Sequence, residues 1–363
     1  MVRRGRNGSG AATPGPATTP VGVIAVSGAA SGLGAALLQQ LAAGPYEAAS
    51  LLALDDVVPS DLPAGVPWRP AHPRDPLLER RLAGVTTLVH LATTFDVTTP
   101  AVTRRALNVR GTAQVLAAAA DSGVRRVVLV TSADVWGARR DNPVPLPDRL
   151  PVRGLPDEDA LVGDHVAVEE LAASSRVPVT VLRPATLVGG VLGPAYDGQL
   201  LRQLQASRLL AVTGREPLWQ LCHAQDLVAA LVRAALGEVS GGLGVACEGA
   251  LPQSRVEELA GRRRLELPEG MAVSAAERLH RLGLTPSSPR ELDHLLGPVV
   301  VASDGLRAAG WSPAWTNEAA LLDHLARSSP DSRVGAYTAA GATLGLLGSA
   351  ALVRRARRRR GSR

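Results

Sequence analysis

Three glycines occur at a spacing that could hold a diphosphate group. Gly28, Gly32 and Gly34 lie in the segment VSGAASGLGAALL, after a short apolar run and at the start of a helix-like stretch. Glycine adopts the positive φ of a tight turn at little cost, and backbone N–H groups at a helix N-terminus attract anions. A third glycine lets helix and strand pack closely. The spacing predicts a dinucleotide-binding turn, although Gly-rich turns also occur without a ligand.

An acidic residue at the end of the next apolar run indicates which dinucleotide would bind. Asp55 closes the segment SLLALDD. A carboxylate at this place accepts hydrogen bonds from a ribose 2′-hydroxyl and repels a 2′-phosphate. The cofactor predicted from the sequence is therefore NAD rather than NADP. The alternative is that Asp55 and Asp56 only form a solvated loop.

The elements that must position these residues alternate between short apolar strands and longer helical stretches. This alternation predicts βαβ units and a parallel sheet. The strands are continuous apolar runs, as expected when helices cover both faces of the sheet. The fold class predicted is therefore α/β, with a doubly wound parallel sheet. Strands are expected at 21–26, 50–56, 86–92, 125–132 and 178–184, and the first helices at 33–44, 103–123 and 157–175.

The charge of the chain is concentrated at one end. Of 39 basic residues, all of them Arg, seven lie in 354–363, and that tail has no acid; the remainder holds 32 basic against 33 acidic residues (39 − 7 = 32). A near-neutral body argues against a nucleic-acid partner. The two cysteines, Cys222 and Cys247, favour a reducing compartment. No apolar run follows the basic start, so a cytoplasmic protein is expected.

Residues 334–353 form an uncharged stretch of twenty residues. At ~1.5 Å per helical residue it could just cross a ~30 Å hydrocarbon core. A single crossing from the cytoplasm would carry seven Arg outward, against the positive-inside tendency. Contact of 334–363 with an anionic membrane surface avoids this conflict. Spanning, surface contact and a weakly ordered tail all stay open.

Several segments together resemble the extended short-chain dehydrogenase/reductase family, of the NAD-dependent epimerase/dehydratase type. They run from roughly residue 21 to residue 326 and include LVHLAT, ALNVRGTAQVLAAAADSGVRRVVLVTSADVWG, PVTVLRPATLVGG, WQLCHAQDLVAAL and LRAAGWSPAWTNEAALLDHL. The resemblance implies a Rossmann-like fold and a set of cofactor contacts. Those contacts would come from Gly28, Gly32, Leu33 and Gly34 at the pyrophosphate, Asp55 at the adenosine ribose, Leu91, Ala92 and Thr93 along the cofactor, Asn108 bracing the active-site helix, and Pro184 at the end of the sixth strand.

The domain boundaries follow from the same resemblance. An NAD(P)-binding Rossmann domain is expected over 21–185, with a returning strand near 243–248. A smaller mixed lobe for substrate, with closing helices, is expected over 186–330. The rest comprises a disordered Gly- and Pro-rich tail at 1–20, an apolar helix at 331–353 and the basic tail at 354–363.

The catalytic residues depart from the family pattern. The resemblance implies that Ser132 polarises the substrate, but the family's Tyr and Lys are replaced by Leu161 and His165, and the chain has no Lys. His165 is either a replacement acid, with Asp164 beside it, or a packing residue. Asp134 either meets substrate or faces water. His72 stands where the family has an Asp that reads adenine, which weakens that contact.

Two functions remain open from the sequence. The first is an atypical NAD(P)-binding epimerase, dehydratase or reductase, acting on a small molecule such as a nucleotide sugar or similar polyol. The second is a non-catalytic NAD(P)-binding sensor or scaffold. The resemblance also implies, as one option, a homodimer paired through helices at 103–121 and 157–175. No metal-ligand spacing is present.

Overall fold

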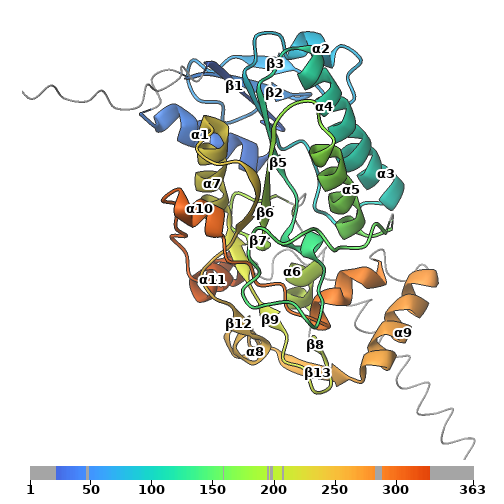
Figure 1. Cartoon of the computed structure of the whole chain (residues 1–363). Coiled ribbons are helices and arrows are strands. Elements are labelled where there is room, and N and C mark those ends of the chain that lie inside the picture. Colours follow the sequence, from blue (N-terminus) through green and yellow to red (C-terminus); the bar gives the residue numbers. More distant parts are fainter. Residues whose placement is uncertain are drawn as a thin grey trace, which may run out of the picture.

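The computed structural model describes part of the chain and divides it into two lobes (Figure 1). The described residues are 22–327, apart from 46–48, 158, 194–195, 197–198, 207 and 283–287. The predictions for 1–20, 331–353 and 354–363 lie outside these residues. Within the described part, none of the helices is long and apolar enough to cross a membrane.

A seven-stranded sheet forms the larger lobe, and every neighbouring pair of strands in it is parallel. The spatial order is β11-β6-β5-β4-β1-β2-β3, so the direction of winding reverses between β1 and β4. The predicted α/β doubly wound fold is confirmed. The strands are β1 (Gly22–Ser27), β2 (Ala49–Asp55), β3 (Trp68–Pro70), β4 (Thr87–His90), β5 (Arg126–Val130), β6 (Val179–Pro184) and β11 (Gly241–Val245).

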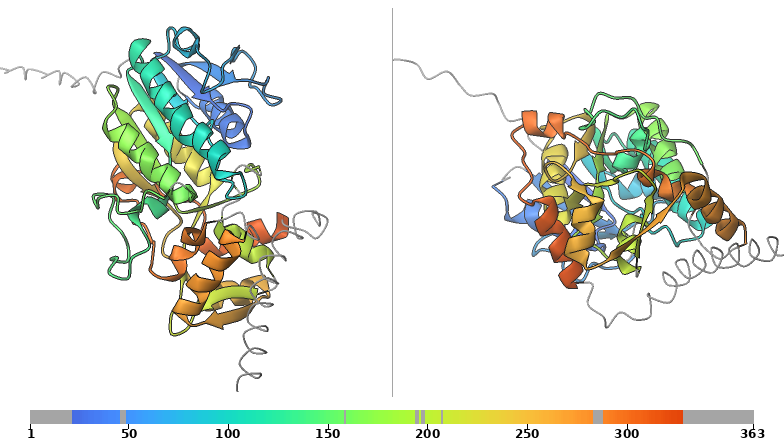
Figure 2. Two further views of the ribbon diagram at one scale, coloured as in Figure 1. Left: turned by 90° about the vertical axis from the view of Figure 1, so that its right-hand side faces the viewer. Right: turned by 90° about the horizontal axis from the view of Figure 1, so that it is seen from below.

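Helices cover both faces of this sheet (Figures 1 and 2). On one face lie α1 (Gly32–Ala43) and α7 (Ala224–Leu236), and on the other α4 (Thr112–Asp121) and α5 (Leu161–Ala173). Along β1, Ile24 and Val26 join the buried cluster under α1 and α7, whereas Ala25 joins the cluster under α4 and α5. This alternation is the side-chain period of a strand. The short α2 (Leu78–Arg81) and α10 (Asp304–Ala308) pack at the edges.

Two helices differ from the sequence prediction. The helix expected at 103–123 is divided into α3 (Ala101–Arg105), a π-helical turn η1 (Ala106–Gly111) and α4. Such a bulge often marks a functional site. The helix expected at 157–175 begins only at Leu161, because the preceding residues fold back over its first turn. A Cβ on Gly163 would lie 1.8 Å from the carbonyl oxygen of Asp157.

The second lobe lies at the carboxyl ends of the strands (Figure 1). It holds three two-stranded sheets, β7–β10 and β8–β13 parallel and β9–β12 antiparallel. The β8–β13 pair and α9 were not predicted. The elements are β7 (Thr186–Val188), α6 (Gln199–Gln205), β8 (Arg208–Val212), β9 (Leu218–Trp219), β10 (Leu221–His223), β12 (Leu251–Pro252), α8 (Gln253–Ala260), β13 (Arg263–Leu267), α9 (Glu269–Arg281), the 3-10 helix η4 (Pro289–Leu295) and α11 (Asn317–Arg327).

Candidate functional site

The glycine turn joins β1 to α1 at the point where the strand order reverses. Gly28 has φ +79°, and a Cβ there would lie 2.6 Å from the carbonyl carbon of Leu91, just past β4. A Cβ on Gly34 would lie 2.2 Å from the carbonyl oxygen of Gly28. Ser31 caps α1, since its hydroxyl accepts the N–H of Gly34 at 3.0 Å. The N–H groups of Gly32 and Leu33, in the first helical turn, have no acceptor one turn back and could bind an anion.

Asp55 lies beside this turn, at the end of β2. Its Oδ2 accepts the N–H of Ala30 at 2.9 Å, and its Oδ1 accepts the N–H of Val57 at 3.3 Å. Burial raises the pKa of Asp55, while the bond from Ala30 opposes that shift. The carboxylate of Asp55 therefore hydrogen-bonds to the glycine turn, at the position where the ribose of a bound adenosine would lie.

His72 makes a local hydrogen bond within its own loop. Its Nδ1 accepts the N–H of Arg74 at 3.0 Å. The nearby Asp75 accepts the N–H of Leu77 at 2.8 Å and pairs with Arg81. Both side chains close local turns, and the weakened adenine contact stays a prediction.

Asn108 ties the π-helical turn to the segment after β4. Its Nδ2 donates to the carbonyl of Thr94, and its Oδ1 accepts the N–H of Thr94, both at 2.9 Å. Leu91, Ala92 and Thr93 precede that anchor and lie next to the glycine turn; the N–H of Thr93 donates to the carbonyl of Leu91 at 2.8 Å. Asn108 thereby fixes the strand end along which a cofactor would lie.

His165 is buried beneath the site. It is 3% exposed and packs against Phe95, with ring centroids 4.8 Å apart. Burial lowers the pKa of His165 to about 3, and the nearby Arg104 acts in the same direction. His165 lines a cavity of about 10 Å³ with His90, Thr112 and others, and its Nδ1 has no partner among the described residues. The ring is neutral and does not line the cavity that contains Ser132.

Ser132 and Asp134 form a pair at the carboxyl end of β5. Ser132 caps the 3-10 helix η2 (Ala133–Trp136), its hydroxyl lies 3.0 Å from Oδ2 of Asp134, and it accepts the N–H of Asp134 at 3.1 Å. Surrounding protein atoms raise the pKa of Asp134, and the bond from Ser132 opposes the shift. A hydroxyl and a carboxylate in this arrangement can exchange a proton with a substrate hydroxyl.

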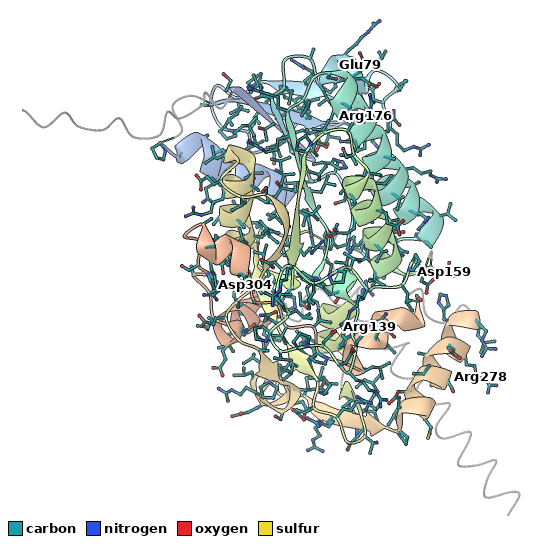
Figure 3. All side chains as sticks on the ribbon, viewed as in Figure 1. Glu79, Arg139, Asp159, Arg176, Arg278 and Asp304 are labelled. Atoms are coloured by element: carbon teal, nitrogen blue, oxygen red, sulfur yellow. The ribbon has the colours of Figure 1, made fainter. Side chains whose placement is uncertain are left out.

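Two cavities meet at this pair. One of about 100 Å³ is lined by Ser132, Asp134 and Leu161, and the other, of about 440 Å³, is lined by Asp134, Arg139 and further residues. Figure 3 places Arg139 near the junction of the two lobes, far from Glu79 and Arg176 at the other end of the sheet. Leu161 contributes an apolar surface to the cavity of Ser132.

A buried ion pair lies behind Ser132 and Asp134. Arg183 of β6 donates to both oxygens of Glu169, at 2.9 and 2.8 Å, and lies over the ring of Trp136 at 4.9 Å. Glu169 also accepts the hydroxyl of Thr131 at 2.8 Å. Pro184 follows Arg183 and ends the strand. These contacts join α5, β5 and β6 directly behind the Ser132 pair.

Comparison with known proteins decides the family. The model of the NAD-dependent epimerase/dehydratase family matches residues 24–243. The chain belongs to this family. A relative from Mycobacterium tuberculosis, named only as an uncharacterized protein, is 30% identical over 321 residues and covers 83% of both chains. A 3-diazoavenalumate denitrifying reductase from Streptomyces is 33% identical over 142 residues, which is 38% of this chain and 46% of the relative.

Solved structures of the family share the fold. The UDP-glucose 4-epimerase of Thermus thermophilus, solved with NAD, is 18% identical with a TM-score of 0.62, over 85% of this chain and 99% of its own. The dTDP-glucose 4,6-dehydratase DesIV of Streptomyces venezuelae, solved with NAD and TYD, is 18% identical with a TM-score of 0.62, over 84% and 96%. The Rossmann-like architecture expected from the sequence is thus confirmed.

Sequence reasoning missed the residues that lie over the glycine turn. A Cβ on Gly32 would lie 1.7 Å from the carbonyl oxygen of Val191. Tyr196 lies beside Ser31 and stacks on Phe95, with centroids 5.3 Å apart. The double glycine at 189–190 was the available signal, because adjacent glycines leave room for neighbouring side chains, here those of His223 and Arg327, to approach the segment that carries Val191.

Proposed function

We propose that the protein is an NAD-binding oxidoreductase-like enzyme with an atypical catalytic site, acting on a nucleotide sugar or a similar polyol. The observation that carries the proposal is the glycine turn at the reversal of strand order, with Asp55 beside it. Ligands of open α/β sheets bind at this position. Membership of the family supports NAD as the cofactor, and the Asp55 carboxylate would disfavour the 2′-phosphate of NADP. Gly28, Gly32, Leu33 and Gly34 would hold its pyrophosphate, and Asn108 and Pro184 would brace its nicotinamide end.

Bound NAD would supply a hydride acceptor. The chain supplies the proton chemistry, for which Ser132 orients the substrate hydroxyl and Asp134 takes its proton. Asp134 is favoured over His165 because it touches Ser132 and faces the same cavity. The predicted catalytic role of His165 stays a prediction, and its burial and lowered pKa weigh against it.

A second candidate is a non-catalytic NAD-binding sensor or scaffold. Leu161 leaves no acid at the family's Tyr position, and the carbonyl of Val191 lies against Gly32. Both observations fit a protein that has kept the fold without the ordinary turnover. A homodimer through 103–121 and 157–175 and membrane contact through 334–363 remain predictions.

Ligand binding separates these candidates from a protein without a cofactor. Thermal unfolding is measured with NAD⁺, NADH, NADP⁺ and NADPH, because a ligand at 100 times its Kd stabilises the folded state by about 2.7 kcal/mol. We expect Tm to rise with NAD⁺ and with NADH, and not with NADP⁺ or NADPH. Reduction of bound NAD⁺ by a panel of UDP- and dTDP-sugars would then favour the enzyme. Binding without any turnover would favour the sensor, and no binding by wild type or by Tyr196→Ala would reject both.

A further inference from the structure

We propose that the chain closes its own dinucleotide site, through a segment here called the arm (residues 189–193 together with Tyr196). Cofactor binding then requires the arm to leave the glycine turn. The inference rests on the proposed function, because it concerns NAD binding at that turn. It goes beyond that function by assigning a built-in competitor for the site.

The first contact of the arm is with the glycine that should face the pyrophosphate. The carbonyl oxygen of Val191 lies so close to Gly32 that a Cβ there would be 1.7 Å away. Gly32 stands at the N-terminus of α1, where the helix dipole favours a negative partial charge. A carbonyl oxygen at this place substitutes for a phosphate oxygen. The carbonyl of Val191 therefore occupies, beside Gly32, the space that a bound diphosphate would need.

The second contact is made by the side chain of Tyr196. This residue is 5% exposed, lies beside Ser31 of the turn and stacks on Phe95 at an interplanar angle of 27°. Phe95 in turn lies against His165. The tyrosine ring thus fills the space between the phosphate turn and the segment after β4, along which the cofactor would extend.

The base of the arm is held by the second lobe. Gly189 has φ +128°, and a Cβ there would lie 3.0 Å from Nε2 of His223. A Cβ on Gly190 would lie 2.4 Å from Nη1 of Arg327, near the end of α11. Both glycines are required for these approaches. Gly189 and Gly190 are thus held in place, and only Val191 and Tyr196 cover the glycine turn. A small movement of the residues after Gly190 would therefore open the turn.

The arm also has its own compact structure. The N–H of Leu192 donates to the carbonyl of Gly189, and the N–H of Tyr196 donates to that of Gly193, both at 3.1 Å. These two amides report on the closed arm, whereas the amides of Gly32 and Leu33 report on the turn. If the closed form dominates, the apparent Kd for NAD equals the intrinsic Kd divided by the open fraction.

The test measures NAD affinity by calorimetry for the full chain and for variants. Tyr196→Ala removes the ring and should tighten NAD binding at least about tenfold, and Tyr196→Phe, which removes only the hydroxyl beside Ser31, about threefold. Leu210→Ala is the control, because it truncates a buried side chain in the second lobe away from the turn. It should leave the affinity unchanged.

Hydrogen exchange gives the second readout. NAD should speed exchange at the amides of Leu192 and Tyr196 and slow it at Gly32 and Leu33. Equal NAD affinity of wild type and Tyr196→Ala, or slower exchange in the arm on binding, overturns the inference while NAD binding stands. No binding by any variant, Tyr196→Ala included, rejects NAD binding itself and the arm's competition with it.

Discussion

The Nε atom of Arg104 lies 2.8 Å from Oδ2 of Asp164, and the two side chains are 2% and 0% exposed. Arg105 approaches the other oxygen of Asp164 at 3.5 Å, and Asn108 approaches Oδ2 at 3.5 Å. Burial raises the pKa of Asp164, and Arg104 opposes that shift. This ion pair joins α3 to α5 next to the π-helical turn. It holds the helix of Leu161 and His165 against the segment that would carry the cofactor.

Breaking this pair should be costly. Asp164→Leu leaves the Arg104 guanidinium buried without its carboxylate, so we expect a loss of about 3–5 kcal/mol in the free energy of unfolding. The double variant Arg104→Met with Asp164→Leu should recover much of that loss, because an apolar pair carries no desolvation cost. Urea unfolding of wild type, Asp164→Leu, Arg104→Met and the double variant measures both effects. A double variant less stable than either single one would contradict the account.

The stability of the protein should depend on pH through His165. Its folded pKa of about 3 lies below its ordinary value of 6.5, so the unfolded chain binds more protons between these values. Stability is therefore present above pH 6.5 and falls as the pH decreases toward 3. His165→Phe removes this pH-dependent contribution. The free energy of unfolding of the variant, relative to that of wild type, should therefore rise by about 1.4 kcal/mol for each pH unit below about 6. Denaturant unfolding at pH 7 and pH 5 tests this, and an unchanged difference between the proteins would contradict it.

If the protein turns over a sugar substrate, Asp134 should carry the proton transfer. Asp134→Asn keeps the shape of the Ser132 pair but removes the base, so we expect kcat to fall by about 10²–10⁴. Asp141→Asn is the control, because Asp141 is exposed and only approaches Arg153 at 3.6 Å. If His165→Phe instead abolished turnover while Asp134→Asn did not, the assignment would be wrong.

Asp55 should decide between the two dinucleotides. Asp55→Ala removes the carboxylate that would bind a ribose 2′-hydroxyl and repel a 2′-phosphate. We expect weaker NAD binding and a smaller preference for NAD over NADP, measured by calorimetry with both ligands. Asp56→Ala is the neighbouring control. Equal effects of the two substitutions would mean that Asp55 belongs only to a solvated loop.

The sequence predicted the large lobe well because its elements are encoded locally. The strand around Ile24 and the helix α1 each have an apolar pattern, and the turn at Gly28 between them has a residue with a fixed conformational preference. The break at Asn108 was not predicted, because it depends on a hydrogen bond to Thr94, fourteen residues earlier. Local apolar periodicity continues through that break and gives no sign of it.

The candidate site was predicted in part. The spacing of the glycines predicted a turn between strand and helix, and the structure has that turn; the role of Ser132 was implied only by the family resemblance and stays a prediction. The cover provided by Val191 and Tyr196 could not be, because it depends on contacts between residues about 160 positions apart in the chain, Gly32 and Val191. The burial of His165 likewise depends on Phe95 and Arg104 from other elements. Chemistry at a lobe junction is set by such long-range packing.

The most direct test of the account is a crystal structure of the chain grown with NAD. We expect the pyrophosphate at the N–H groups of Gly32 and Leu33, with Asp55 at the adenosine ribose and the carbonyl of Val191 moved off Gly32. A turn that still holds Val191 against Gly32 at saturating NAD, with no dinucleotide beside it, would contradict the central claim that this turn is a cofactor site.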